Sequence, residues 1–244
     1  MPEKNIQTNI QHSFDSTLKD ANLEGIAIDI SEVGIDLLLD DRVLKDVPIV
    51  GTLVGLAKFG ANVRDRLFLK KVLTFLLQIK DVTAEERKKM VDDIDGSKKY
   101  RVKVGEKLLY VIDACNDYEI SELVGTLFKA YLEGKITYDN FLKASAVLQK
   151  MGMDDFAWFK KNGPAKRYFD LDDIGDLISS GLFELHYEQI DVRIEDETDK
   201  DRLIDGKKYS TDVDGGVSVH LTTAAETILE VFCPEYEKPK VIKL

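Results

Sequence analysis

Residues 47–79 read VPIVGTLVGLAKFGANVRDRLFLKKVLTFLLQI, and the expected architecture of the chain follows from this stretch. It begins with apolar and glycine residues, becomes basic after position 63, and ends in a strongly apolar segment. From Val63 to Ile79 the apolar residues recur at helical spacing and occupy more than half of the helix circumference. We therefore expect a helix over residues 63–79 that lies at the centre of a helical bundle.

The first part of the stretch predicts a shorter helix over residues 48–60. Pro48 suits the first turn of a helix, and Gly51 and Gly55 stand four residues apart, which permits close approach of a neighbouring helix. The apolar run from Val47 to Ala57 is well short of the roughly 20 residues that a membrane-spanning helix needs. This segment is therefore not expected to span a bilayer.

Helical patterns on both sides extend the bundle. Thr83 precedes Glu86 by three residues, which is the spacing of a capping box, and Gly96 supplies a stop for that helix. Residues 1–21 are polar, and we predict that they form a mobile or weakly helical N-terminal segment. Apolar residues at helical spacing predict further helices over residues 22–40, 83–95, 101–115, 118–133 and 137–151.

After residue 152 the pattern changes to a mixture of helices and strands. Gly163-Pro164 predicts a turn, and Asp214-Gly215-Gly216 predicts a hairpin turn. The order of the expected elements is typical of a winged-helix-like unit. These elements are a short helix over residues 170–180, a strand over 182–192, an acidic loop over 195–206, a strand over 216–221 and a helix over 222–232.

The predicted fold class is therefore mainly α. An N-terminal helical bundle over residues 22–152 is expected to precede a winged-helix-like α+β domain over residues 153–244. The two halves also differ in charge: Lys58–Lys103 has thirteen Lys and Arg against seven Asp and Glu, whereas Ala165–Leu244 has ten against nineteen. This asymmetry indicates two units with different surfaces.

The net charge and the cysteine content restrict the function classes. A formal net charge of −11 argues against binding to nucleic acid. The expected recognition helix of the winged unit has four acidic and no basic residues over Asp170–Asp176, which also disfavours contact with phosphate. Two separated cysteines fit a reducing compartment, and the first twenty residues have no signal-peptide pattern. We expect a cytoplasmic protein.

Residues 104–148 carry a resemblance to a known group. The sequence VGEKLLYVIDACNDYEISELVGTLFKAYLEGKITYDNFLKASAVL resembles the TerB-like helical modules of bacterial tellurite-resistance and phage-stress proteins. Together with RDRLFLKK at residues 64–71, it is similar to uncharacterised bacterial proteins, some of them encoded near abortive-infection genes. The resemblance covers residues 45–150 and implies a helical module with a role in stress response or phage defence. The acidic metal-binding cluster of the tellurite-resistance members is not evident in this sequence.

The sequence has no pattern that predicts catalytic residues, a metal site or a cofactor. The expected function is a non-enzymatic interaction module that binds a protein partner or associates with itself. The basic junction after the 48–60 helix is the candidate partner-binding surface, although a solvated helix face with an internal Arg–Asp pair is the more common explanation of such a pattern. The residues of this candidate surface are Arg64, Arg66, Lys70 and Lys71.

Two alternative functions also fit the sequence. A membrane-acting effector would insert the apolar face of the helix over residues 48–59 into a bilayer, as a peripheral contact helped by anionic lipid. An enzyme of unrecognised type is the other alternative. The residues proposed for membrane contact are Ile49, Val50, Leu53, Leu56 and Phe59.

Overall fold

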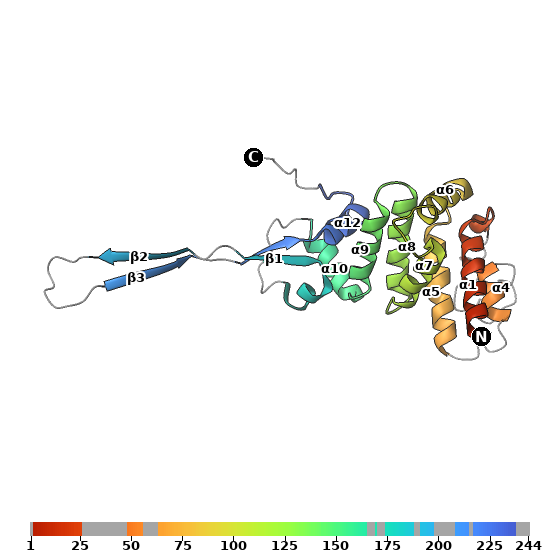
Figure 1. Ribbon diagram of the computed structural model, residues 1–244, viewed down its shortest axis with the longest axis horizontal. Helices are drawn as coiled ribbons and strands as arrows, with labels where there is room; N and C mark the ends of the chain where they lie inside the picture. The colour runs from red at the N-terminus through yellow and green to blue at the C-terminus, as the bar shows by residue number, and fades with distance from the viewer. Residues whose placement is uncertain are drawn as a thin grey trace.

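The computed structural model describes residues 2–25, 48–55, 63–164, 169, 174–187, 191–197, 208–214 and 217–237. Within these ranges the fold is mainly helical, as the sequence predicted. Figure 1 shows the helices stacked side by side in an elongated body, with α1 and α4 at one end. The helices are α1 (Pro2–Leu18), α4 (Pro48–Gly55), α5 (Val63–Gln78), α6 (Ala84–Asp95), α7 (Val104–Asp113), α8 (Tyr118–Leu132), α9 (Tyr138–Leu148), α10 (Met153–Asn162), the 3-10 helix η2 (Gly175–Ser180) and α12 (Thr223–Phe232).

The pair formed by α5 and α8 is the centre of the bundle. Residues 72–76 of α5 are all buried, as the width of the apolar pattern predicted. Gly125 in α8 lies so close to α5 that an added Cβ would stand 2.8 Å from the carbonyl oxygen of Phe75. That distance is shorter than a non-bonded carbon–oxygen contact, so glycine at this position allows the two helices to approach.

A row of aromatic rings crosses the bundle from α1 to α9. Phe14 contacts Phe75 with ring centroids 6.3 Å apart, and Phe75 contacts Phe128 at 5.6 Å. Phe128 contacts Phe141 at 5.2 Å, and Phe141 contacts Tyr138 at 5.8 Å. These five side chains are buried and belong to one apolar core. Aromatic pairs at such distances add stability beyond the area that they bury.

Helix boundaries inside the bundle follow local sequence signals. Thr83 and Glu86 form the predicted capping box at the start of α6, because the side chain of each accepts a hydrogen bond from the backbone N–H of the other. Thr137 caps α9 by accepting from the N–H of Asn140. Gly134, which follows α8, has φ of 72°, a left-handed conformation that favours glycine over other residues.

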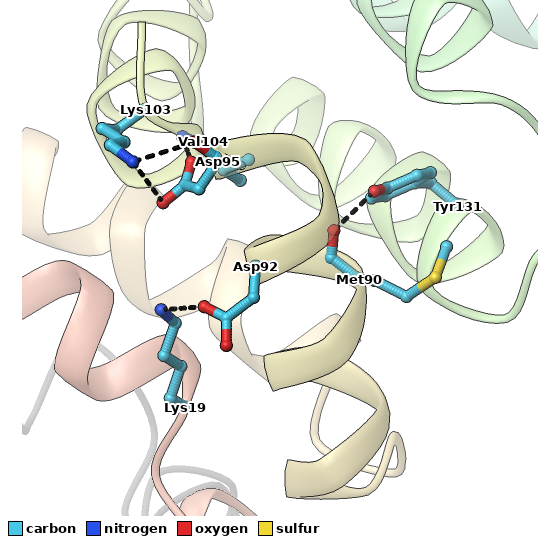
Figure 2. A network of polar contacts seen from close by, with 7 residues as sticks. All are labelled: Lys19, Met90, Asp92, Asp95, Lys103, Val104 and Tyr131. Atoms are coloured by element: carbon cyan, nitrogen blue, oxygen red, sulfur yellow. Dashed lines mark hydrogen bonds and ion pairs between the residues drawn. The ribbon is translucent and has the colours of Figure 1, made fainter. Parts of the chain in front are cut away.

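Polar contacts hold α6 against three other helices (Figure 2). Lys19, just after α1, forms an ion pair of 2.8 Å with Asp92 of α6. Asp95 accepts a hydrogen bond of 2.8 Å from the backbone N–H of Val104, the first residue of α7. The hydroxyl of Tyr131 in α8 donates to the carbonyl of Met90 at 2.9 Å. The short helix α6 therefore joins the start of α7 to α1 and α8.

The N-terminal residues, which the sequence predicted to be mobile or weakly helical over residues 1–21, are helical from Pro2 to Leu18. They form α1, in which Phe14 and Leu18 are almost completely buried. The buried hydroxyl of Thr17 accepts a hydrogen bond from the N–H of Ile49 at 3.1 Å, which connects α1 to α4. The signal for this helix is an apolar residue at every fourth position, namely Ile6, Ile10, Phe14 and Leu18.

Asp15 of α1 is a half-buried carboxylate that faces α7. Its Oδ1 is buried and has no hydrogen-bond partner among the described residues. This oxygen would lie 2.0 Å from a Cβ added at Gly105, so the carboxylate packs directly on the first turn of α7. Burial raises the pKa of Asp15 above its ordinary value, although the charge of Lys19 acts in the opposite direction.

Asp15→Asn is expected to raise the melting temperature at pH 7. The pKa of Asp15 is higher in the folded than in the unfolded state, where it is about 4. The wild-type protein therefore loses stability as the pH rises from the unfolded pKa through the folded pKa. Above the folded pKa its stability stays at this lower level. The difference between variant and wild type should therefore shrink as the pH falls below about 4. Thermal melts between pH 3 and 8 measure it, with the exposed Asp93→Asn as the control. A difference that does not change with pH would contradict this prediction.

The strands pair in two antiparallel ladders, and their topology corrects the predicted hairpin. Strand β1 (Phe183–Tyr187) pairs with β4 (Val217–Leu221), and β2 (Asp191–Glu197) pairs with β3 (Lys208–Asp214). The single strand predicted over residues 182–192 is thus divided between β1 and β2. The predicted acidic loop begins inside β2, and β3 was not predicted. The partner of β4 is β1 and not β3, and Gly215 and Gly216 of the predicted hairpin turn lie outside the described residues.

The ladders differ in their relation to the helices. The β1–β4 ladder adjoins the helical body, where Leu182, Phe183 and Val219 are buried in the common core. Figure 1 shows β2 and β3 as a ribbon that extends away from the helices. Helix α12 packs against α9 and α8, so the apolar core continues across the predicted boundary at residue 152. The division into domains at that position stays a prediction.

Candidate functional site

The first half of α5 borders two adjoining cavities. One, of about 270 Å³, lies between α1, α5 and α7. The other, of about 620 Å³, lies between α5 and the connection from α7 to α8. Arg64 and Phe68 of α5 and Asp113 of α7 line both cavities. We call the two cavities together the α5–α7 groove.

Exposed apolar side chains gather around this groove. Val63 and Leu67, one helical turn apart on α5, are 72% and 53% exposed. Tyr110 of α7 is 52% exposed, and Tyr118 at the start of α8 is 38% exposed. Tyr110 lines the first cavity, and the other three line the second. A concentration of large apolar groups at the surface marks an interaction site more often than a solvated face.

The four predicted partner-binding cations have different surroundings. Arg64 is exposed and lines both cavities, whereas Arg66 is exposed and lines neither. The Nζ of Lys70 lies 3.9 Å from the ring centre of Tyr118, a cation–π contact at the rim of the second cavity. The Nζ of Lys71 donates to the carbonyls of Asp113, at 3.1 Å, and Cys115.

Lys71 therefore has a role within the fold that the sequence did not indicate. The carbonyls that it contacts belong to the last turn of α7 and the residues after it, and helix-end carbonyls are stabilised by cations. Its ammonium group fixes the connection between α7 and α8, next to the second cavity. Of the predicted surface, Arg64, Lys70 and Lys71 all line the second cavity together with exposed apolar groups, but the ammonium group of Lys71 is already engaged by backbone carbonyls.

Acidic residues also line the groove, so its charge is mixed. Asp65, Glu106 and Asp113 line the first cavity, and Asp113 and Asp117 line the second. Asp117 is also the cap of α8, because its Oδ1 accepts from the N–H of Ile120 at 2.8 Å. The sequence analysis considered the charged residues of α5, Asp65 among them, but missed Glu106, Asp113, Asp117 and the two tyrosines. These residues come from α7, from the connection after it and from the start of α8, and they meet α5 only in the folded chain.

The residues predicted to contact a membrane lie partly in the buried core and partly outside the described residues. Ile49 and Val50 are 0% and 2% exposed and pack in the core at the α1–α4 contact. Leu53 belongs to α4, and Leu56 and Phe59 lie outside the described residues. Insertion of this helix would therefore require α4 to leave α1. Within the described ranges, every helix is too short or too polar to cross a bilayer.

The two cysteines lie in the interior of the described part of the chain. Both Cys115 and Cys233 are buried and free of disulfides. Burial raises the pKa of Cys115 to about 12, so its thiol remains protonated at neutral pH and is a poor nucleophile. Across the described residues, no group of three or more His, Cys, Asp or Glu side chains has an arrangement able to hold a metal ion.

Comparisons with protein-family models, curated proteins and solved structures found no match to this chain. Inference about function must therefore start from the α5–α7 groove and from the sequence.

Proposed function

We propose that the protein is a non-enzymatic interaction module that binds a protein partner through the α5–α7 groove. The observation that carries this proposal is the gathering of four exposed apolar side chains around two adjoining cavities. Exposure of Leu67 and the tyrosines to water is unfavourable, and burial against a partner removes that cost. The groove includes tyrosine and arginine, the residue types that dominate binding energy at protein interfaces.

The contacts within the groove favour a partner with both apolar and charged groups. The ammonium group of Lys70 lies over the Tyr118 ring. This contact restricts the tyrosine side chain before binding, so less conformational entropy is lost on association. Arg64 borders both cavities beside Asp113, so complementary charges on the partner would set its orientation. Aspartates and a glutamate in the lining, together with a net charge of −11, disfavour a nucleic acid as the ligand.

The proposal includes the biological setting that the sequence resemblance implies. Helices α5, α7, α8 and α9 span the residues that resemble a TerB-like module, and the β1–β4 ladder precedes α12 in the region expected to be winged-helix-like. We propose a cytoplasmic protein of bacterial stress response or phage defence, with these two units. The resemblance supports the setting, and the groove supports the mode of action.

Leu67→Asp is expected to weaken partner binding by tenfold or more. Burial of a leucine side chain contributes about 1.5 to 3 kcal/mol, and about 1.4 kcal/mol corresponds to a factor of ten in affinity. The test places a photo-crosslinking amino acid at Tyr110 in the otherwise wild-type and Leu67→Asp chains. Crosslinked proteins are identified by mass spectrometry, and the affinity of the main one is then measured by calorimetry.

Val102→Asp is the matched control for this prediction. Val102 is 40% exposed, similar to Tyr118, but it precedes α7 and lines neither cavity of the groove. We expect Val102→Asp to bind like wild type, and both variants to keep the wild-type melting temperature because both side chains are exposed. Equal binding by wild type and Leu67→Asp would exclude the groove as the contact surface.

A further inference from the structure

The β1–β4 ladder brings two histidines together on one face. In the antiparallel register, Glu184 stands opposite His220, and His186 stands opposite Ser218. These four positions alternate with Leu185 and Val219, and Val219 is buried in the core, so the four side chains share the outer face of the ladder. The ring centroids of His186 and His220 are 4.6 Å apart.

Each of the two rings has a polar neighbour on its own strand. The Nε2 of His186 lies 3.2 Å from Oε1 of Glu184, and the Nε2 of His220 lies 3.0 Å from the hydroxyl oxygen of Ser218. In metal sites, a histidine that binds the ion with one nitrogen usually donates its other N–H to a carboxylate or another oxygen. The carboxylate beside His186 and the hydroxyl beside His220 match that outer arrangement.

We propose that His186 and His220 form a two-histidine site for a divalent transition-metal ion such as zinc, copper or nickel. Imidazole nitrogen is a ligand that suits these ions, whereas magnesium and calcium require oxygen ligands. Bonds from such an ion to nitrogen are about 2.0 to 2.1 Å long. The centroid separation of 4.6 Å is short enough for both rings to bind one ion. With no third side chain in position among the described residues, water completes the coordination.

The proposed site lies at the ends of β1 and β4 that are nearest to the ribbon of β2 and β3. His186 is next to Tyr187, the last residue of β1, and Ser218 follows Val217, the first residue of β4. The ribbon of β2 and β3 lies beyond these ends (Figure 1). A metal ion that bridges the two strands at this point holds together residues that are far apart in the sequence, and so opposes their separation. Metal binding would stabilise the base of the ribbon.

Nuclear magnetic resonance of the wild-type chain tests the site without any substitution. The chain has three histidines, and His12, on α1, serves as an internal control. On addition of zinc sulfate we expect the imidazole resonances of His186 and His220 to shift together with one saturation curve, while those of His12 stay in place. Resonances of His186 and His220 that do not move, or that move only in parallel with His12, would overturn the proposal.

Calorimetric titration with Zn²⁺ gives the contribution of each ligand. We expect His186→Asn and His220→Asn each to lower the affinity by about tenfold or more, and His12→Asn to leave it unchanged. Glu184→Gln should lower it by roughly tenfold, the usual effect of losing an outer-shell carboxylate. Mg²⁺ at the same concentrations should give no heat of binding at this site. Zinc affinity that persists without both His186 and His220 would place the ion elsewhere and contradict the proposal.

Discussion

Phe128→Ala is expected to lower the free energy of unfolding by about 3 to 5 kcal/mol, the usual cost of removing a large buried aromatic side chain. Phe128 is completely buried and contacts Phe75 of α5, Tyr131 of α8 and Phe141 of α9 at centroid distances of 5.2 to 5.7 Å. Three helices surround the ring, so they cannot all move inward to fill the cavity. Urea denaturation followed by circular dichroism measures the loss.

Phe68→Ala is the matched control for Phe128→Ala. Phe68 is also a phenylalanine in the central helix pair, but it is partly exposed at the α5–α7 groove. Its truncation leaves a space that opens to solvent, so we expect less than half of the loss measured at Phe128. If the two substitutions destabilised the protein equally, the central position of Phe128 in the core would be wrong.

The parts of the fold that the sequence predicted are those determined by local signals. The apolar pattern of residues 63–79 covers most of a helix surface, and only a buried helix such as α5 satisfies it. Thr83 with Glu86, and Thr137 before α9, satisfy backbone groups within three residues of themselves. Such signals require no information about the rest of the chain.

The predictions were incomplete or wrong where the structure depends on distant residues. Helix α1 is polar apart from one apolar residue in four, and its stability depends on packing against α4 and α7. Strands β2 and β3 are rich in aspartate and glutamate, which have low strand propensity, and each is held by its partner strand. The pairing of β1 with β4 joins segments separated by thirty residues. A local reading of Gly215-Gly216 as a hairpin turn could not reveal that pairing.

The candidate site also combines residues that local sequence signals predicted with residues that only the folded chain brings together. The sequence identified Arg64 and Lys70 as part of a charged surface, because the change from apolar to basic is visible along α5. It could not separate Lys70 from Lys71, since the carbonyls that accept from Lys71 lie more than forty residues away. Tyr110 had the pattern of an ordinary amphipathic helix. Its importance for a binding surface depends on the neighbouring cavity, which only the packing of α7 on α5 creates.

Arg87→Ala is expected to lower the free energy of unfolding by about 2 to 4 kcal/mol, since each buried carbonyl that loses its partner costs about 1 to 3 kcal/mol. Arg87 of α6 is only 2% exposed, and its guanidinium donates to three backbone carbonyls. Its Nε lies 2.7 Å from the carbonyl oxygen of Leu18 at the end of α1, and its other nitrogens contact the carbonyls of Asp20 and Val82. Burial lowers the pKa of Arg87, but arginine remains charged at neutral pH.

Substitutions at and beside Arg87 separate its geometry from its charge. Arg87→Lys keeps the charge, but a single ammonium group cannot reach three carbonyls that a planar guanidinium contacts together, so we expect most of the loss to remain. Lys88→Ala removes an exposed cation from the same helix and should change stability by less than about 0.5 kcal/mol. Urea denaturation gives these values, and hydrogen exchange should show faster opening at the end of α1 in both Arg87 variants. If Arg87→Ala were as stable as Lys88→Ala, these hydrogen bonds would not fix α1 to α6, and the packing of Phe14 and Leu18 alone would have to hold α1 in place.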